Sequence, residues 1–140
     1  MNRLILFVIL VALLMSHREP AVLSVVREKY VLLKKQLATT GQFPQLQQDV
    51  ILTGMQKQGP QGDVGYNVNK GHEIFLCLKG DLNSVMHVLL HELAHMTVTE
   101  YDHSSKFWGN LGELKRVAKD MGIYEGIGTK TFCDGEIRDE

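Results

Sequence analysis

The chain has 140 residues, 44% of them hydrophobic, and a formal net charge of −1 at pH 7. This length suits one domain with a real hydrophobic core and is too short for two. The near-neutral charge lacks the basic excess of an electrostatic nucleic-acid binder, so we expect no nucleic-acid partner.

An apolar run, LILFVILVALLM, occupies residues 4–15 and follows Arg3. Twelve helical residues rise about 18 Å, less than the roughly 30 Å of a bilayer's hydrocarbon core, so the run has the length of a short anchor or of a signal peptide's apolar segment. Leu14-Met15-Ser16 fits a signal-peptide cleavage site poorly. We therefore expect residues 1–18 to form an uncleaved, single-pass membrane anchor rather than a cleaved signal.

Residues 19–134 are expected to form the main domain, which opens with an amphipathic helix. Pro20 suits the first turn of a helix, and Gly41 follows the last one. Between them, apolar side chains recur at steps of three and four residues, at Val22, Val26, Tyr30, Leu33 and Leu37.

Three later segments have the composition of strands, at residues 50–53, 64–68 and 73–78. Turn-forming sequences separate them. We expect a small antiparallel or mixed sheet packed on a helix, which makes the fold α+β. Gly65-Tyr66-Asn67 is a candidate sheet edge to which an extended peptide could add as a strand, although an ordinary hairpin strand explains it equally well.

A helix that starts near Asp81 would carry the residues with the clearest chemistry. Asp81, Asn83 or Ser84 can cap its start, and the run before His91 is apolar. His91 and His95 lie four residues apart, so both imidazoles project from one helix face at a spacing that can bind one Zn²⁺. Glu92 completes an H-E-x-x-H pattern, in which it acts as general base on metal-bound water. The alternative is a helix whose histidines are merely hydrogen-bonded or exposed.

A catalytic zinc ion needs a third protein ligand. His103 is the nearest imidazole downstream, and it stands just before a last helix that Ser104 or Ser105 would cap. We expect His103 to be the third ligand. Asp102 and Glu100 are the alternatives, because carboxylates also bind zinc.

Other polar side chains near the motif have open roles. His87 lies one turn before His91, where it would face water or, as a second choice, line the pocket. A donor for the oxyanion of peptide hydrolysis is also needed, and Tyr101, Tyr124 or a histidine could provide it.

The end of the chain mixes isolated apolar residues with glycines and charges, and we expect residues 135–140 to be a mobile tail. Cys77 and Cys133 are the only cysteines. Cys77 is most simply a buried thiol in a core strand, and a Cys77–Cys133 disulfide is the alternative if the domain faces an oxidising compartment.

The segments GYNVNKGHEIFLCL, LNSVMHVLLHELAHM and DHSSKFW together resemble the WLM family of minimal zinc metallopeptidases, over roughly residues 45–133. They are most similar to small membrane-anchored members encoded by large DNA viruses and some algae. The resemblance implies a compact α+β zincin-like domain, zinc held by His91, His95 and His103, and Glu92 as the base. We expect no extension for binding DNA or ubiquitin-like modifiers, so the crosslink-repair role of larger members is not carried over.

The predicted function is zinc-dependent hydrolysis of a peptide or protein substrate, by a domain anchored in a virion or host membrane. Glu92 would take a proton from a zinc-bound water that attacks the peptide carbonyl. The alternative is a membrane-tethered structural or virion component whose zinc site only stabilises the fold. A base beside the ligands favours catalysis, because a structural site has no use for one.

Overall fold

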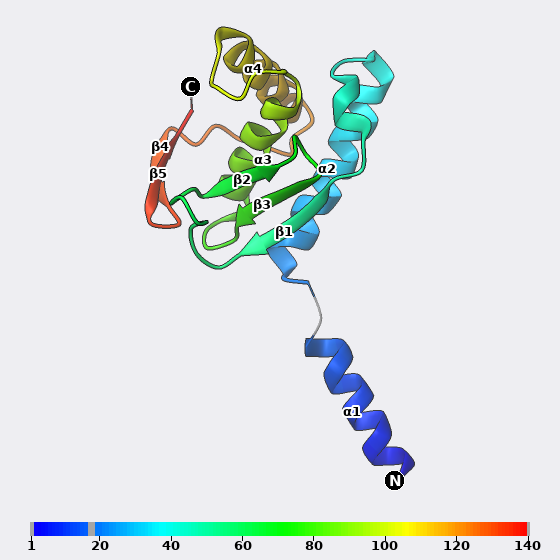
Figure 1. Ribbon diagram of the computed structural model, residues 1–140. Coiled ribbons are helices and arrows are strands. Elements are labelled where there is room, and N and C mark those ends of the chain that lie inside the picture. The colour runs from blue at the N-terminus through cyan, green and yellow to red at the C-terminus, as the bar shows by residue number, and fades with distance from the viewer. Residues whose placement is uncertain (1, 17–18, 140) are drawn as a thin grey trace.

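The computed structural model describes residues 2–16 and 19–139, with the backbone alone at residues 14–16 (Figure 1). Its architecture is α+β, as the sequence predicts. The helices are α1 (Arg3–Ser16), α2 (Ala21–Thr40), α3 (Leu82–Met96) and α4 (Ser105–Asp120), with a short 3-10 helix at Pro44–Gln47. The strands are β1 (Ile51–Met55), β2 (Gly65–Val68), β3 (Glu73–Cys77), β4 (Thr129–Phe132) and β5 (Gly135–Arg138).

The central sheet has three strands in the order β1-β3-β2. β1 runs parallel to β3, with Leu52 opposite Ile74, whereas β2 runs antiparallel to β3, with Tyr66 opposite Phe75. The sequence predicted an antiparallel or mixed sheet, and the mixed form is confirmed. β2 lies at an edge of this sheet and packs against α3 (Figure 1).

Helix α3 is the central element of the core. It contacts α2, α4, β2 and β3, and its apolar side chains Val85, Leu89 and Leu90 are fully buried. Burial of one such side chain stabilises the fold by roughly 1.5–3 kcal/mol. The helix that carries H-E-x-x-H is therefore held on several sides, and the backbone of the candidate site is firmly placed.

Helix α2 covers the sheet and α3 with the apolar stripe that its sequence period predicted. Four of the five predicted positions are buried, at Val26, Tyr30, Leu33 and Leu37, and Val22 is partly buried. Gly41 has a φ of 75° and closes the helix by donating its backbone N–H to the carbonyl of Leu37.

Helix α1 contains the whole apolar run, and the side chains described in it, at residues 3–13, are exposed, for example Leu4 at 66% and Phe7 at 63%. Within the part of the chain that the structure describes, no helix combines the length and the apolar character that crossing a membrane requires. Residues 17 and 18, the end of the predicted anchor, lie outside the described residues.

The end of the chain differs from the expected mobile tail. β4 and β5 pair into an antiparallel hairpin, and Phe132 and Ile137 are buried. Cys133, in the hairpin turn, forms a disulfide with Cys77 across 56 residues of sequence. Closing a loop of that length stabilises the fold by about 4 kcal/mol on the chain-entropy model. The hairpin is thus fastened to the end of β3, and residue 140 lies outside the described residues.

Candidate metal centre

The first two predicted ligands come from one face of α3. Asp81 caps this helix, because its carboxylate accepts hydrogen bonds from the backbone N–H of Ser84 at 3.2 Å and from its hydroxyl at 2.6 Å. Helical spacing then places His91 and His95 one turn apart, with ring centroids 5.1 Å from each other. Of the three possible caps, Asp81 is therefore the one the helix uses.

His103 joins these two histidines from the loop before α4. Its Nε2 lies 3.2 Å from the Nε2 of His95, and ligand atoms of all three histidines lie within 4.8 Å of one another. Two nitrogens bound at roughly 2.0–2.1 Å to a tetrahedral zinc ion are about 3.3 Å apart. The separation of the His95 and His103 nitrogens therefore fits a shared zinc ion.

The rival carboxylates are not part of this cluster. Glu100 turns to the start of α4, where its carboxylate accepts a hydrogen bond from the Ser104 hydroxyl at 2.6 Å. Asp102 is exposed, and neither acid belongs to the group of possible metal ligands among the described residues. The structure thus brings together the three histidines that the sequence predicted.

Aromatic packing holds His103 in place. Ser104 caps α4 by accepting a hydrogen bond from the N–H of Phe107 at 3.1 Å. The fully buried Phe107 ring stacks on His103, with centroids 4.7 Å apart and planes 28° apart. Trp108 lies 5.3 Å from the same imidazole. The aromatic pair that opens α4 therefore packs directly on the third imidazole.

Lys70 orders the chain between the second and third histidines. Its Nζ donates to the carbonyls of His95 at 3.0 Å, Val98 at 3.1 Å and Glu100 at 2.5 Å. These carbonyls lie at the end of α3 and in the loop that leads to His103, where a lysine can satisfy groups that the helix leaves unpaired. The sequence gives no sign of this role for Lys70, because nothing local indicates acceptors 25 to 30 residues away.

Glu92 points toward β2 and is 6% exposed. The side-chain amide of Asn67, on β2, donates to the carboxylate of Glu92 at 3.0 Å and to its backbone carbonyl at 2.8 Å. Burial raises the pKa of Glu92 to about 7, and the hydrogen bond from Asn67 opposes that rise. A carboxyl with a pKa near neutrality can both take and return a proton, which is what a general base and acid must do.

Close packing of β2 on α3 makes this contact possible. A Cβ at Gly65 would lie 2.4 Å from the Val88 side chain and 3.1 Å from the carbonyl oxygen of Phe75. Only glycine lets the edge strand approach the helix so closely. The predicted edge Gly65-Tyr66-Asn67 is thus at the sheet edge and beside the histidines.

The imidazoles are suited to bind a cation. Burial, followed by repulsion from the neighbouring histidines, lowers the pKa of His91 to about 3, and burial and His103 together lower the pKa of His95 to about 4. Both rings are therefore neutral at pH 7. A neutral imidazole offers a nitrogen lone pair, and a metal need not first displace a proton from it.

A cleft of about 280 Å³ opens over this cluster. It is lined by the three histidines, Glu92, Asn67, Lys70 and Tyr101, among others. Tyr101 is 81% exposed and its ring lies 4.3 Å from Lys70 Nζ. Of the two tyrosines considered as oxyanion donors, only Tyr101 lines this cleft, whereas the hydroxyl of Tyr124 donates to Asp139.

His87 differs from the expectation that it faces water. It is 6% exposed, and its Nδ1 lies 3.1 Å from the Tyr124 hydroxyl. Burial, with the nearby positive charge of Lys115, lowers its pKa to about 4. The chain end folds back over this part of α3, so a position that looked like helix surface became interior.

Comparison with known proteins agrees with this geometry. A WLM domain matches residues 50–135, more than half of the chain. An uncharacterized protein of Acanthamoeba polyphaga mimivirus is 38% identical over 79 residues, which cover 51% of this chain and 40% of that protein. An uncharacterized protein of Invertebrate iridescent virus 6 is 36% identical over 81 residues, which cover 51% of this chain and 44% of that protein.

The chain thus spans less than half the length of these two viral relatives. No solved structure matches it. The resemblance drawn from the HELAH and DHSSKFW segments is confirmed by the domain match, which covers both of them. The chain belongs to the WLM domain family.

Proposed function

We propose that this protein is a zinc-dependent peptidase with a zincin-like active site. The observation that carries the proposal is the convergence of His91, His95 and His103 beside the buried carboxyl of Glu92. A purely structural zinc site normally closes with four protein ligands, whereas three ligands leave a position open for chemistry.

A zinc ion held by the three imidazoles would polarise the peptide carbonyl and make a water molecule more acidic. Glu92 accepts the proton of the attacking water and then returns it to the leaving amine. Asn67 orients the Glu92 carboxylate through its hydrogen bond. Its own Oδ1 is buried and accepts no hydrogen bond within the described residues. Tyr101 lines the cleft and can donate its hydroxyl proton to the developing oxyanion.

The edge strand β2 supports a peptide as substrate. Its inner side pairs with β3, and its outer side borders the cleft of the histidines. An extended peptide can add to such an edge through backbone hydrogen bonds. Strand addition would hold the scissile bond over the three histidines without requiring a deep pocket for every side chain.

The test uses the full chain loaded with zinc and a mixed peptide library read by mass spectrometry. Glu92→Gln is expected to keep its zinc and to cleave at least about 100-fold more slowly, because general acid–base catalysis contributes about 10²–10⁴-fold. His95→Ala is expected to lose both zinc and cleavage. Glu125→Gln, on an exposed side chain outside the cleft, is the matched control and should behave like wild type.

Two results would contradict the proposal. Unchanged cleavage by Glu92→Gln would remove the base from the mechanism. Zinc-loaded wild type that cleaves no peptide, yet unfolds when the zinc is removed, would instead support a structural metal site.

We also propose that α1 attaches the domain to a membrane. The exposed apolar side chains of this 14-residue helix would be buried in lipid, and each helical residue adds about 1.5 Å to its reach. Leu10→Glu should reduce flotation of the full chain with phospholipid vesicles. Leu32→Glu, at an exposed apolar position of α2, is the control and should not.

A further inference from the structure

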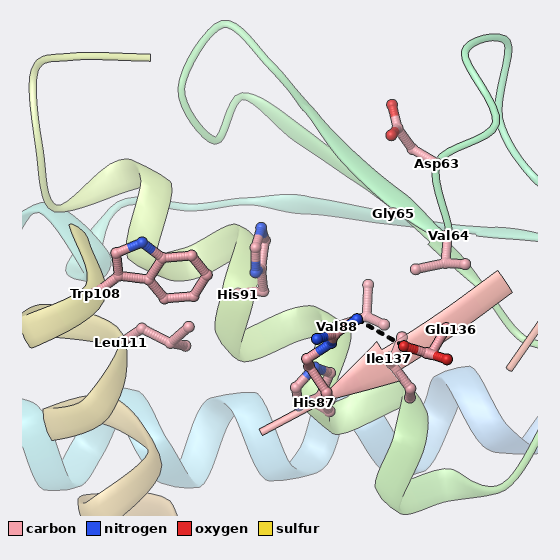
Figure 2. Close-up of a pocket in the computed structure, with 11 residues that line it drawn as sticks. Asp63, Val64, Gly65, His87, Val88, His91, Trp108, Leu111, Glu136 and Ile137 are labelled. Carbon is pink, nitrogen blue, oxygen red and sulfur yellow. Dashed lines mark hydrogen bonds and ion pairs between the residues drawn. The ribbon is translucent and has the colours of Figure 1, made fainter. Parts of the chain in front are cut away.

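A second cavity, of about 260 Å³, lies directly beside the metal centre (Figure 2). Helices α3 and α4 form one side of it, and β5 and the start of β2 form the other. Sites for drug-sized ligands typically occupy about 300–1,000 Å³. This cavity is therefore sized for one large amino-acid side chain rather than for a whole cofactor.

Apolar side chains form most of the interior of the cavity, and its rim is charged. Val88, Leu111 and Ile137 are buried side chains that line it, and Val64 and Trp108 are partly buried. The imidazoles of His87 and His91 complete the interior. Asp63, Glu136 and Arg138 are exposed residues of the lining. Burying a charged group against such a surface is costly, whereas burying an aliphatic or aromatic group is favourable. The cavity thus favours an apolar occupant.

The two cavities form a continuous path along β2. Both are lined by Asp63, Gly65 and His91, so the imidazole of His91 separates the catalytic cleft from the apolar cavity. The apolar cavity adjoins the start of β2, and the cleft extends to Asn67 and beyond. A peptide that pairs antiparallel with β2, the more stable arrangement, would pass the histidines first and the cavity next.

The outer wall of the cavity belongs to the C-terminal hairpin. Glu136, Ile137 and Arg138 follow the last residue of the WLM match, so this wall is a feature of the chain outside the matched domain. The hairpin is fastened by the Cys77–Cys133 disulfide. It also packs tightly on Gly80, where a Cβ would lie 2.4 Å from the Phe132 ring.

We infer that the hairpin-walled cavity binds one apolar side chain of the substrate, from the residue that directly follows the cleaved bond. This inference rests on the proposed peptidase function. It adds the substrate class, which is peptides with a large aliphatic or aromatic residue at that position. Val64, Ile137 and Trp108 would select this residue by its size and apolar character.

The first experiment compares cleavage profiles of zinc-loaded proteins on one peptide library. Wild type is expected to prefer leucine, methionine or phenylalanine after the cleaved bond, by at least 10-fold over alanine, since each methylene in an apolar pocket contributes about 10- to 200-fold. Val64→Phe, which narrows the cavity, should shift the preference to small residues, and Ile137→Ala should admit larger ones. Val31→Phe, on the exposed side of α2, is the size-matched control and should keep the wild-type profile.

The second experiment does not depend on cleavage. Trp108 is the only tryptophan of the chain, so its fluorescence reports on the cavity. N-acetyl-leucinamide should change this emission in the full chain at concentrations at least 10-fold lower than N-acetyl-aspartamide carrying a free β-carboxylate, and Val64→Phe should weaken the leucine response. Circular-dichroism melting verifies that each variant is folded.

The outcomes distinguish failure of the cavity assignment from failure of the peptidase function. Cleavage of the library with the same profile in wild type, Val64→Phe and Ile137→Ala would overturn the cavity assignment and leave the peptidase function standing. A library that stays uncleaved would count against the peptidase function, and the fluorescence titration would still decide the cavity. Equal fluorescence responses to the leucine and aspartate compounds, or no response to either, would overturn the cavity assignment.

Discussion

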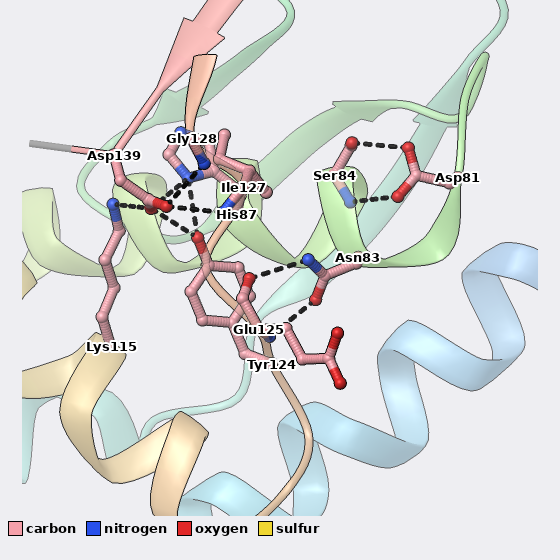
Figure 3. Close-up of polar contacts among 10 residues, drawn as sticks. All are labelled: Asp81, Asn83, Ser84, His87, Lys115, Tyr124, Glu125, Ile127, Gly128 and Asp139. Atoms are coloured by element: carbon pink, nitrogen blue, oxygen red, sulfur yellow. Dashed lines mark hydrogen bonds and ion pairs between the residues drawn. The ribbon is translucent and has the colours of Figure 1, made fainter. Parts of the chain in front are cut away.

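Two histidines on successive turns of α3 are used in different ways. His87 belongs to a group whose polar atoms bond to one another (Figure 3). The Tyr124 hydroxyl lies 3.1 Å from His87 and donates to Asp139 at 2.8 Å, and Lys115 donates to Asp139 at 3.0 Å. His91, one turn later, instead faces two other imidazoles across a cleft.

The comparison shows that a perturbed pKa does not by itself identify a functional histidine. Burial lowers the pKa of His87 to about 4 and that of His91 to about 3, so both rings are neutral at pH 7. The partners distinguish them. The imidazole of His87 contacts a tyrosine that donates its own proton to a carboxylate, and this group stabilises the chain end. Three converging imidazole nitrogens could instead hold a cation.

Replacing each histidine in turn is the most direct test of whether His91 binds zinc while His87 only stabilises the fold. His91→Ala should weaken zinc binding by more than 100-fold, because loss of a direct ligand must cost more than the roughly 10–100-fold loss seen for groups that only orient ligands. His87→Ala should leave zinc affinity within a few-fold and lower thermal stability instead. Competition titration with a zinc chelator and circular-dichroism melting measure the two effects. Equal zinc loss in both variants would mean that His87 is part of the metal centre.

The arrangement of the candidate metal site was accessible from sequence for a specific reason. His91, Glu92 and His95 are placed relative to one another by helical period alone, so the H-E-x-x-H spacing defines their arrangement once the helix forms. His103 required one further step, since a loop residue depends on where the next helix docks. Its place as the nearest downstream imidazole, just before the serine that caps the next helix, was the useful signal.

The contacts that surround the histidines, and the C-terminal hairpin, were not accessible in the same way. Asn67 and Lys70 act on partners about 25 residues away, and no local pattern encodes such contacts. The hairpin leaves only a displaced signal in the sequence. Asp-Gly is typical of a tight hairpin turn, but the two turn residues are Cys133 and Asp134, with φ of 50° and 60°, and Gly135 already pairs with Phe132. Without that hairpin, a water-facing position was the first expectation for His87, and lining a pocket was the second.

The next prediction concerns Asp139, which fastens the chain end. Asp139→Asn should lower the free energy of unfolding by roughly 2–3 kcal/mol, because it leaves the buried ammonium of Lys115 without its carboxylate. This is less than the roughly 3–5 kcal/mol for a fully buried pair, since the Asp139 side chain is 27% exposed. Asp120→Asn is the matched control. Its pair with Arg116 is largely exposed, so the change should stay within about 0.5 kcal/mol by urea denaturation.

The Asp139 effect should also depend on pH in a defined direction. Burial opposes ionisation of Asp139, but hydrogen bonds from Lys115, Tyr124 and two backbone amides outweigh it and hold its pKa well below the usual range. Its contribution is therefore fully present above the unfolded pKa of about 3.9 and is lost as the pH falls toward the folded value. The stability gap between wild type and Asp139→Asn should be constant from pH 5 to 7 and shrink below pH 4. A gap that grows on acidification would contradict this assignment.

The smallest expected effect concerns Lys70, whose ammonium is fully hydrogen-bonded, as the polar atoms around His87 are. Its three acceptors, however, lie on the segment that connects His95 to His103. The prediction tests whether these hydrogen bonds affect zinc affinity by positioning His103. Lys70→Met keeps the aliphatic stem and removes the donors, so His103 should be held less firmly and zinc affinity should fall by about 10-fold. Lys70→Arg should recover part of that loss, and Lys79→Met, at an exposed lysine, should have none of it. A Lys70→Met protein that melts at a lower temperature but binds zinc as tightly as wild type would contradict this prediction. The position of the His103 imidazole would then not depend on the loop that Lys70 holds, and Lys70 would only stabilise the fold.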